Sequence, residues 1–175
     1  YSTQYAFAAL KNDGSVVAWG DASYGGSNPG TVSSGVVAVY SNLYAFAALK
    51  TNGSVIAWGN SSNGGTTPGT VSSGVVAVYS TQIAFAALKT DGSVVAWGDS
   101  SYGGTTPGAV SSGVVAVYSN YYAFAALKTN GSVVAWGLSD YGGTTPGAVS
   151  SGVVAVYKSR EAFSALKNDG SVVAW

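Results

Sequence analysis

Hydrophobic residues occur in short runs that recur at a fixed interval along the chain. A run such as Val75-Val76-Ala77-Val78 is followed by Ala84-Phe85-Ala86-Ala87-Leu88 and then by Val94-Val95-Ala96-Trp97. The apolar residues follow one another directly, without the alternation of apolar and polar positions that is typical of a half-exposed strand. The pattern therefore predicts strands in sheets that are covered on both faces.

These runs belong to a repeat of 39 residues. The repeat units cover residues 1–39, 40–78, 79–117 and 118–156, and a partial unit covers 157–175. We interpret residues 1–175 as a single repeat array. Because one hairpin alone is only marginally stable in water, each unit must be stabilised by packing against its neighbours.

A turn signal separates the last two apolar runs of every unit. It is Asp-Gly or Asn-Gly, and its glycines are Gly14, Gly53, Gly92, Gly131 and Gly170. This dipeptide between apolar runs is a strong hairpin signal, since both residues tolerate the positive φ that a tight turn needs. We therefore expect five antiparallel hairpins.

The segment that joins successive units, such as residues 98–113, is rich in Gly, Ser, Thr and Pro. Pro107 cannot donate to a strand ladder, so it indicates a turn or a sheet edge, and we expect Val110 to lie in a short fourth strand. The fold class is all-β. Tight hairpins favour radial β-propeller blades, and a β-solenoid is the alternative.

Aromatic residues recur once per unit and are the predicted core. The predicted core residues are Trp19, Trp58, Trp97, Trp136, Trp175, Phe46, Phe85 and Phe124. Burial of each Trp would contribute roughly 4–6 kcal/mol as an upper estimate. The alternative for the Trp residues is a row of platforms on which sugars stack.

The third unit resembles the RCC1-like repeat, the repeat of the regulator of chromosome condensation. The similarity lies in Ala87-Leu88, Asp91-Gly92, Val94 and Trp97-Gly98, and it recurs in every unit. Two departures stand out: Ala84 occupies the family's His position, and the unit is shorter after Trp-Gly. The resemblance implies a β-propeller, usually of seven blades. The family's nucleotide exchange and chromatin binding depend on loops and tails outside the repeat, so they are not carried over.

Composition excludes several kinds of chemistry. Charged residues make up 8% of the chain, seven basic and seven acidic, and there is no Cys, His or Met. Disulfides, and metal sites of thiolate or imidazole ligands, are therefore excluded. Without a basic patch we expect no nucleic-acid partner. Because no His can activate a serine and most carboxylates lie in turns, we expect no enzyme, catalytic residue, metal or cofactor.

Two groups of positions vary between units. One is the loop before the hairpin: residues 3–5, 42–44, 81–83, 120–122 and 159–161; the other follows Trp-Gly. Since exposed loops on a rigid scaffold carry function, we expect ligands there, and our candidate ligand-binding residues are Asp21, Tyr24, Asp99, Tyr102 and Tyr141. The last unit differs by its charged Lys158, Arg160 and Glu161.

These observations predict a non-catalytic structural or adhesive repeat scaffold. We expect it to belong to a larger extracellular or cell-surface protein, because the chain lacks a starting Met and has extreme repetition and low charge. The alternatives are a lectin-like carbohydrate-binding propeller and a protein-interaction propeller. The expected partners are glycans or another protein surface, self-association is expected, and no membrane span is present, since no apolar run reaches 18 residues.

Overall fold

The computed structural model describes residues 1–175 and consists of antiparallel strands and short 3₁₀ helices. The first strands are β1 (Ala6–Leu10), β2 (Val16–Gly20), β3 (Val36–Ser41), β4 (Ala45–Lys50), β5 (Val55–Gly59), β6 (Val75–Ser80) and β7 (Ala84–Lys89). They are followed by β8 (Val94–Gly98), β9 (Val114–Ser119), β10 (Ala123–Lys128), β11 (Val133–Gly137), β12 (Val153–Lys158), β13 (Phe163–Lys167) and β14 (Val172–Ala174).

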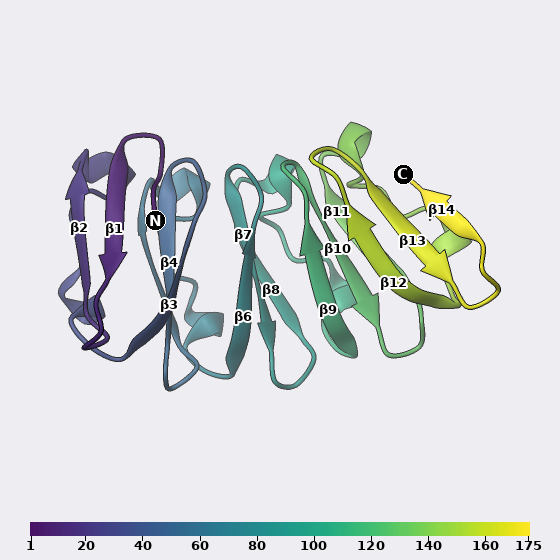
Figure 1. Ribbon diagram of the computed structural model, residues 1–175, viewed down its shortest axis with the longest axis horizontal. Helices are drawn as coiled ribbons and strands as arrows, with labels where there is room; N and C mark the ends of the chain where they lie inside the picture. The colour runs from purple at the N-terminus through teal and green to yellow at the C-terminus, as the bar shows by residue number, and fades with distance from the viewer.

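The strands form five small sheets that lie side by side in an open row (Figure 1). The pair β1–β2 is at one end, and the three-stranded sheets β3-β4-β5, β6-β7-β8, β9-β10-β11 and β12-β13-β14 follow. The leading strands β3, β6, β9 and β12 are next to one another. This arrangement is that of propeller blades and not of a solenoid. Each leading strand crosses a boundary of the sequence repeat; β3, for example, spans residues 36–41.

Every predicted hairpin forms, and its turn extends beyond the Asp-Gly or Asn-Gly dipeptide. In the second sheet Lys50 N donates to Ser54 O and Gly53 N donates to Lys50 O, both at 2.9 Å, so three residues lie between the bonded residues Lys50 and Ser54. Only Gly53 has a positive φ, 74°, and no residue other than glycine has one anywhere in the chain. The Asx residue contributes its side chain instead: Asn52 Oδ1 accepts from Ser54 N and Ser54 Oγ.

The expected fourth strand is absent, and the prediction for Val110 was wrong. Each connecting segment, or connector, forms two 3₁₀ turns instead. These are η1 (Ala22–Tyr24), η2 (Gly30–Val32), η3 (Ser61–Asn63), η4 (Gly69–Val71), η5 (Ser100–Tyr102), η6 (Gly108–Val110), η7 (Ser139–Tyr141) and η8 (Gly147–Val149). Pro107 lacks an N–H for a ladder, and Ser111 N donates back to Gly108 O, so this segment bonds to itself. No helix has the length and hydropathy needed to cross a membrane.

The core lies between the sheets. One typical interface places Ala84, Ala86 and Val94 of one sheet against Phe124 and Trp136 of the next. Both faces of the central strands of the interior sheets are buried, as their unbroken apolar runs predict. The prediction was wrong for the leading strands, because Val76 and its equivalents Val37, Val115 and Val154 are about half exposed. The small alanine side chains leave room for the aromatic rings of the adjacent sheet.

Burial of the predicted core residues depends on their place in the row. Phe46, Phe85, Phe124, Trp58, Trp97 and Trp136 are buried. Trp19 differs from the expectation, because 50% of it is exposed on the face of the first hairpin that no other sheet covers. Trp175, on the last strand pair, is only partly buried. The pattern missed Phe163 and the fully buried Val32, Val71, Val110 and Val149 of the connectors.

Candidate functional site

The loops before the hairpins lie together at one end of the blades. The first residue of each loop builds the turn. Asn42 Oδ1 accepts from Tyr44 N and Ala45 N, and its Nδ2 donates to Asn63 O at 2.7 Å. Thr81 performs the same capping with its hydroxyl. This position varies only among short polar side chains, because a cap needs an oxygen close to the backbone.

The middle residues of these loops form a continuous row, which we call the loop row: Gln4, Leu43, Gln82, Tyr121 and Arg160. Each member donates its backbone N–H to the carbonyl of the next. The bonds run from Gln4 to Leu43 at 2.7 Å, from Leu43 to Gln82 at 2.9 Å, and onward through Tyr121 to Arg160. The blades are therefore tied together at this end, and the row's side chains differ from unit to unit.

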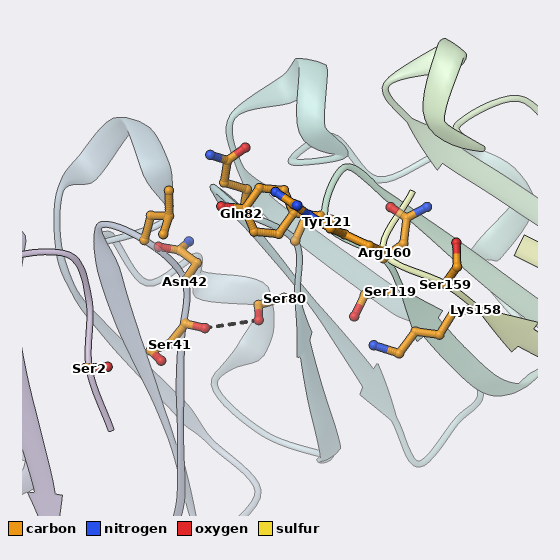
Figure 2. A pocket seen from close by; sticks show the side chains of 13 residues that line it. Ser2, Ser41, Asn42, Ser80, Gln82, Ser119, Tyr121, Lys158, Ser159 and Arg160 are labelled. Atoms are coloured by element: carbon orange, nitrogen blue, oxygen red, sulfur yellow. Dashed lines mark hydrogen bonds between the residues drawn. The ribbon is translucent and has the colours of Figure 1, made fainter. Parts of the chain in front are cut away.

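A groove with a volume of about 410 Å³ runs beside the loop row (Figure 2). We call it the loop-end groove; Leu43, Gln82, Tyr121 and Arg160 are among its lining residues. The last residues of the leading strands also contribute to the lining: Ser41, Ser80, Ser119 and Lys158. Ser2, which pairs with Phe7 in an isolated bridge, continues this row. The groove is therefore lined mainly by uncharged polar residues, and its only charged lining residues are Lys158 and Arg160.

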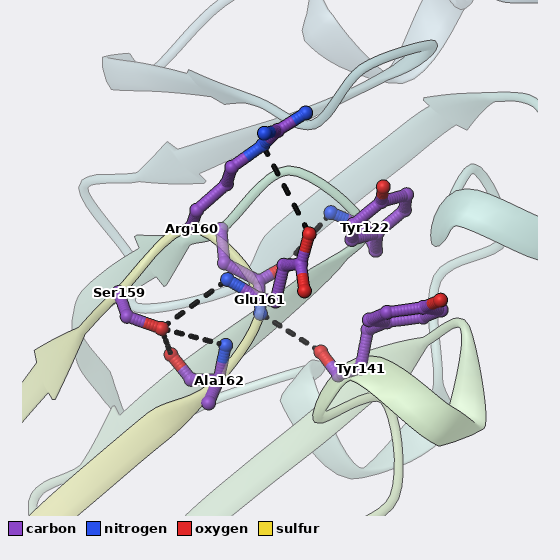
Figure 3. Close-up of polar contacts among 7 residues, drawn as sticks. Tyr122, Tyr141, Ser159, Arg160, Glu161 and Ala162 are labelled. Carbon is purple, nitrogen blue, oxygen red and sulfur yellow. Dashed lines mark hydrogen bonds and ion pairs between the residues drawn. The ribbon is translucent and has the colours of Figure 1, made fainter.

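The candidate tyrosines lie on the connectors, outside the lining of this groove. They pack against tyrosines at the third loop position. Tyr24 lies between Tyr5 and Tyr44, with ring centroids 4.7 and 5.5 Å apart. Tyr102 and Tyr141 both contact Tyr122. The rings of Tyr122 and Tyr141 are stacked, with centroids 4.2 Å apart and planes inclined by 28° (Figure 3). The tyrosines therefore form two groups, one around Tyr24 and one around Tyr122. Between them, Asn63 and Ile83 occupy the equivalent positions in place of tyrosine.

The group formed by Tyr102, Tyr122 and Tyr141 lies near a charged residue of the last loop, Glu161. Desolvation raises the pKa of Tyr122 above its ordinary value, and the nearby Glu161 carboxylate raises it further. Glu161 is held in place by its turn, because Ser159 Oγ accepts from the N–H groups of Glu161 and Ala162 (Figure 3). The raised pKa keeps the Tyr122 hydroxyl protonated at neutral pH.

The candidate aspartates have a local structural role. Asp21 Oδ1 accepts from Ser23 N at 2.8 Å, and Asp99 Oδ1 accepts from Ser101 N at 2.9 Å. Each thus caps the 3₁₀ turn that begins its connector, as Asn60 also does. No group of three or more His, Cys, Asp or Glu residues is placed to hold a metal ion.

Several solved structures have a fold similar to that of this chain. No protein-family model and no curated protein matches the chain by sequence. Among solved structures, the ectodomain of the receptor kinase CR4 from Physcomitrella patens is 17% identical with a TM-score of 0.65. This chain is covered over 100% of its length, and that ectodomain over 50%. Prp20p of Saccharomyces cerevisiae, the yeast RCC1, is 17% identical with a TM-score of 0.62, over 98% of this chain and 55% of Prp20p.

The chain has an RCC1-like repeat fold. A third similar structure, the CRINKLY WD40 ectodomain of the Arabidopsis thaliana receptor kinase ACR4, has a TM-score of 0.59 at 15% identity, over 99% of this chain and 62% of that ectodomain. The RCC1-like resemblance in the sequence is thus confirmed at the level of fold. The chain spans only about half to three fifths of these solved chains.

Proposed function

We propose that this chain is a non-catalytic repeat scaffold that binds another protein through the loop-end groove. One observation carries the proposal: the blade core scarcely changes between units, whereas Leu43, Gln82, Tyr121 and Arg160 differ at a single equivalent position beside the groove. A rigid scaffold with variable side chains along one groove is a common basis of recognition by repeat proteins.

The similar structures support a role in protein binding. Yeast RCC1 has been solved bound to Kap60, and the plant proteins are receptor ectodomains. A setting outside the cell or at its surface fits the two plant ectodomains and forms part of the proposal.

A non-catalytic role is supported by the groove's chemistry. Its serines have neither a His nor a carboxylate beside them among the lining residues. Lys158 carries the only side-chain amine that lines the groove and could act as a base, and its Nζ takes part in no hydrogen bond or ion pair. An activated nucleophile requires a base within hydrogen-bonding reach.

The lectin-like alternative depends on Tyr24, Tyr102 and Tyr141. A sugar stacks on the open face of an aromatic ring. The stacked contact between Tyr122 and Tyr141, with ring centroids 4.2 Å apart, directs one face of each ring at the other. At that pair, one face of each ring is therefore not open to a stacking sugar.

Selection from a displayed peptide library tests the proposal. The comparison is between the 175-residue chain and a variant with Leu43→Ser, Gln82→Ser, Tyr121→Ser and Arg160→Ser. We expect peptides that bind the unmodified chain saturably and lose at least tenfold in affinity for the variant. Circular dichroism and thermal melting of the variant check that the blades remain folded.

A matched control variant changes four exposed serines at the opposite end of the leading strands: Ser34, Ser73, Ser112 and Ser151, each to Ala. It should bind the selected peptides as the unmodified chain does. The proposal is overturned if no peptide distinguishes the loop variant from the control. Saturable binding on a glycan array, in the absence of such peptides, would instead support the lectin-like alternative.

A further inference from the structure

Positive charge is concentrated at one end of the loop-end groove. Lys158 and Arg160, its only charged lining residues, both come from the last unit. The chain as a whole has no net charge, with seven basic and seven acidic residues. The groove is thus lined by uncharged residues along most of its length and by cationic residues at one end.

Lys158 differs from the other lysines in what its ammonium group contacts. Lys50, Lys89, Lys128 and Lys167 each donate from Nζ to a connector carbonyl, at distances of 2.7–3.3 Å. Lys158 makes no such bond and has no carboxylate partner, and Figure 2 shows its side chain directed into the groove. A free ammonium group in a groove is available to an anionic ligand.

Arg160 is held in position without being neutralised. Its guanidinium carbon lies 5.1 Å from the centre of the Tyr121 ring, which is the distance range of a cation–π contact. Its one acidic contact is Glu161 at 4.0 Å, and both side chains are largely exposed. Such a pair is weak in water, so the guanidinium can exchange it for a ligand carboxylate.

The rest of the groove suits an extended backbone. The hydroxyls of Ser41 and Ser119 make no hydrogen bond within the protein, and a hydroxyl can both donate and accept. The loop row spans four intervals, each comparable to the ~4.8 Å between hydrogen-bonded strands. That is roughly 20 Å, the length of about six residues in an extended chain.

We propose that the loop-end groove binds an extended acidic segment of a protein partner. The segment places its carboxylates between Lys158 and Arg160 and its apolar side chains near Leu43, and its backbone lies along the serines. This inference rests on the proposed function, and it adds the chemistry of the ligand and its orientation along the groove.

Fluorescence anisotropy with labelled hexapeptides tests the inference. The probes are Leu-Gly-Ser-Gly-Glu-Glu, the same sequence reversed, and a counterpart of each with Gln in place of Glu. We expect one acidic peptide to bind at least tenfold more tightly than its Gln counterpart at low ionic strength. The preference should fall as salt is added, because exposed charges are screened.

Charge-removing variants locate the binding site. Lys158→Gln and Arg160→Gln should each weaken the acidic peptide at least fivefold and leave the Gln peptide unchanged. Lys11→Gln is the matched control, because it removes the same charge at the opposite end of a hairpin and should change neither affinity.

Three outcomes would overturn the inference: equal affinity for the Glu and Gln peptides, an equal loss in Lys11→Gln, or binding of heparin with no binding of either acidic peptide. The proposed function is tested separately. If the displayed library gives groove-dependent peptides without acidic residues, the scaffold binds protein through this groove, but not in the way inferred.

Discussion

The Asx residue of each hairpin turn accepts the same hydrogen bonds whether it is Asp or Asn. Asp13 Oδ1 accepts from Ser15 N and Ser15 Oγ at 2.9 and 2.6 Å, and Asn52 Oδ1 does so from Ser54 at 3.0 and 2.7 Å. The units with Asp add a charge to this geometry, and the charge makes these turns depend on pH.

The pKa of Asp13 is lowered from 3.8 to about 2, first by its side-chain bond from Ser15 and then by the Ser15 N–H. A carboxyl with a lowered pKa in the folded state stabilises that state above its unfolded pKa. The contribution is lost as the pH falls from 3.8 towards 2. We expect carbon NMR of the carboxyl to give this low midpoint and Ser15→Ala to raise it. A midpoint near 3.8 in the unmodified chain would contradict the assignment.

Phenylalanines at equivalent positions differ in what they contribute to stability. Phe85 is fully buried, whereas 53% of Phe7 is exposed. Phe85→Ala should lower the free energy of unfolding by about 3–5 kcal/mol, because it leaves a cavity between two sheets. Phe7→Ala should cost about 1 kcal/mol. Urea denaturation measures both, and equal losses would contradict the packing described here.

At the scale of the element, the strands could be predicted from the sequence and the connectors could not. Apolar runs and Asp-Gly or Asn-Gly turns are local signals, and they located all five hairpins. The connectors are determined by contacts with other strands. Thr106 Oγ1, for example, accepts from Ala96 N at 2.7 Å. Val110 is apolar because it fills a core between sheets, and no local pattern distinguishes that from a strand.

The candidate site shows the same division. Variation between units drew attention to the loops before the hairpins, and these loops line the groove. The candidate residues Asp21, Asp99 and Tyr141 were chosen from the connectors, where capping and ring packing account for their positions. The loop row depends on hydrogen bonds between residues 39 positions apart, for example between Leu43 and Gln82, which the sequence does not reveal.

Two glycines of one connector test how closely it packs. A Cβ on Gly103, whose φ is +90°, would lie 2.7 Å from Phe124 Cδ2, whereas a Cβ on Gly108 would meet nothing within 4 Å. Gly103→Ala should destabilise the protein by about 2–4 kcal/mol through strain and overpacking. Gly108→Ala should change stability by less than about 1 kcal/mol. Thermal unfolding distinguishes the two, and similar melting temperatures would rule out the close contact.

At the scale of the whole molecule, the two ends of the row leave apolar surface uncovered. Phe7, Val17 and Trp19 are about half exposed on the first hairpin, and Val172 is 65% exposed on the last sheet. Between interior sheets the equivalent faces pack together. Large exposed apolar patches are sites of association.

We therefore expect the 175-residue chain to self-associate at its ends. Sedimentation velocity should give a weight-average mass that rises with concentration, and Phe7→Ser combined with Trp19→Ser should reduce the rise. Val76→Ser combined with Val115→Ser is the control, because these valines are equally exposed but lie on the leading strands. A mass that stays monomeric at every concentration would contradict the expectation.

The hydrogen bonds between units have a consequence for how the array can change. None joins residues more than 39 positions apart, so every unit is bonded only to its neighbours. Unequal recombination within the gene could therefore delete residues 79–117 and leave a junction that satisfies the same bonds. The product would lose Gln82 from the middle of the loop row and bring Leu43 next to Tyr121. Gain or loss of one repeat unit would thus change the order of side chains along the loop row, while the blades keep the same fold and the same hydrogen bonds between units.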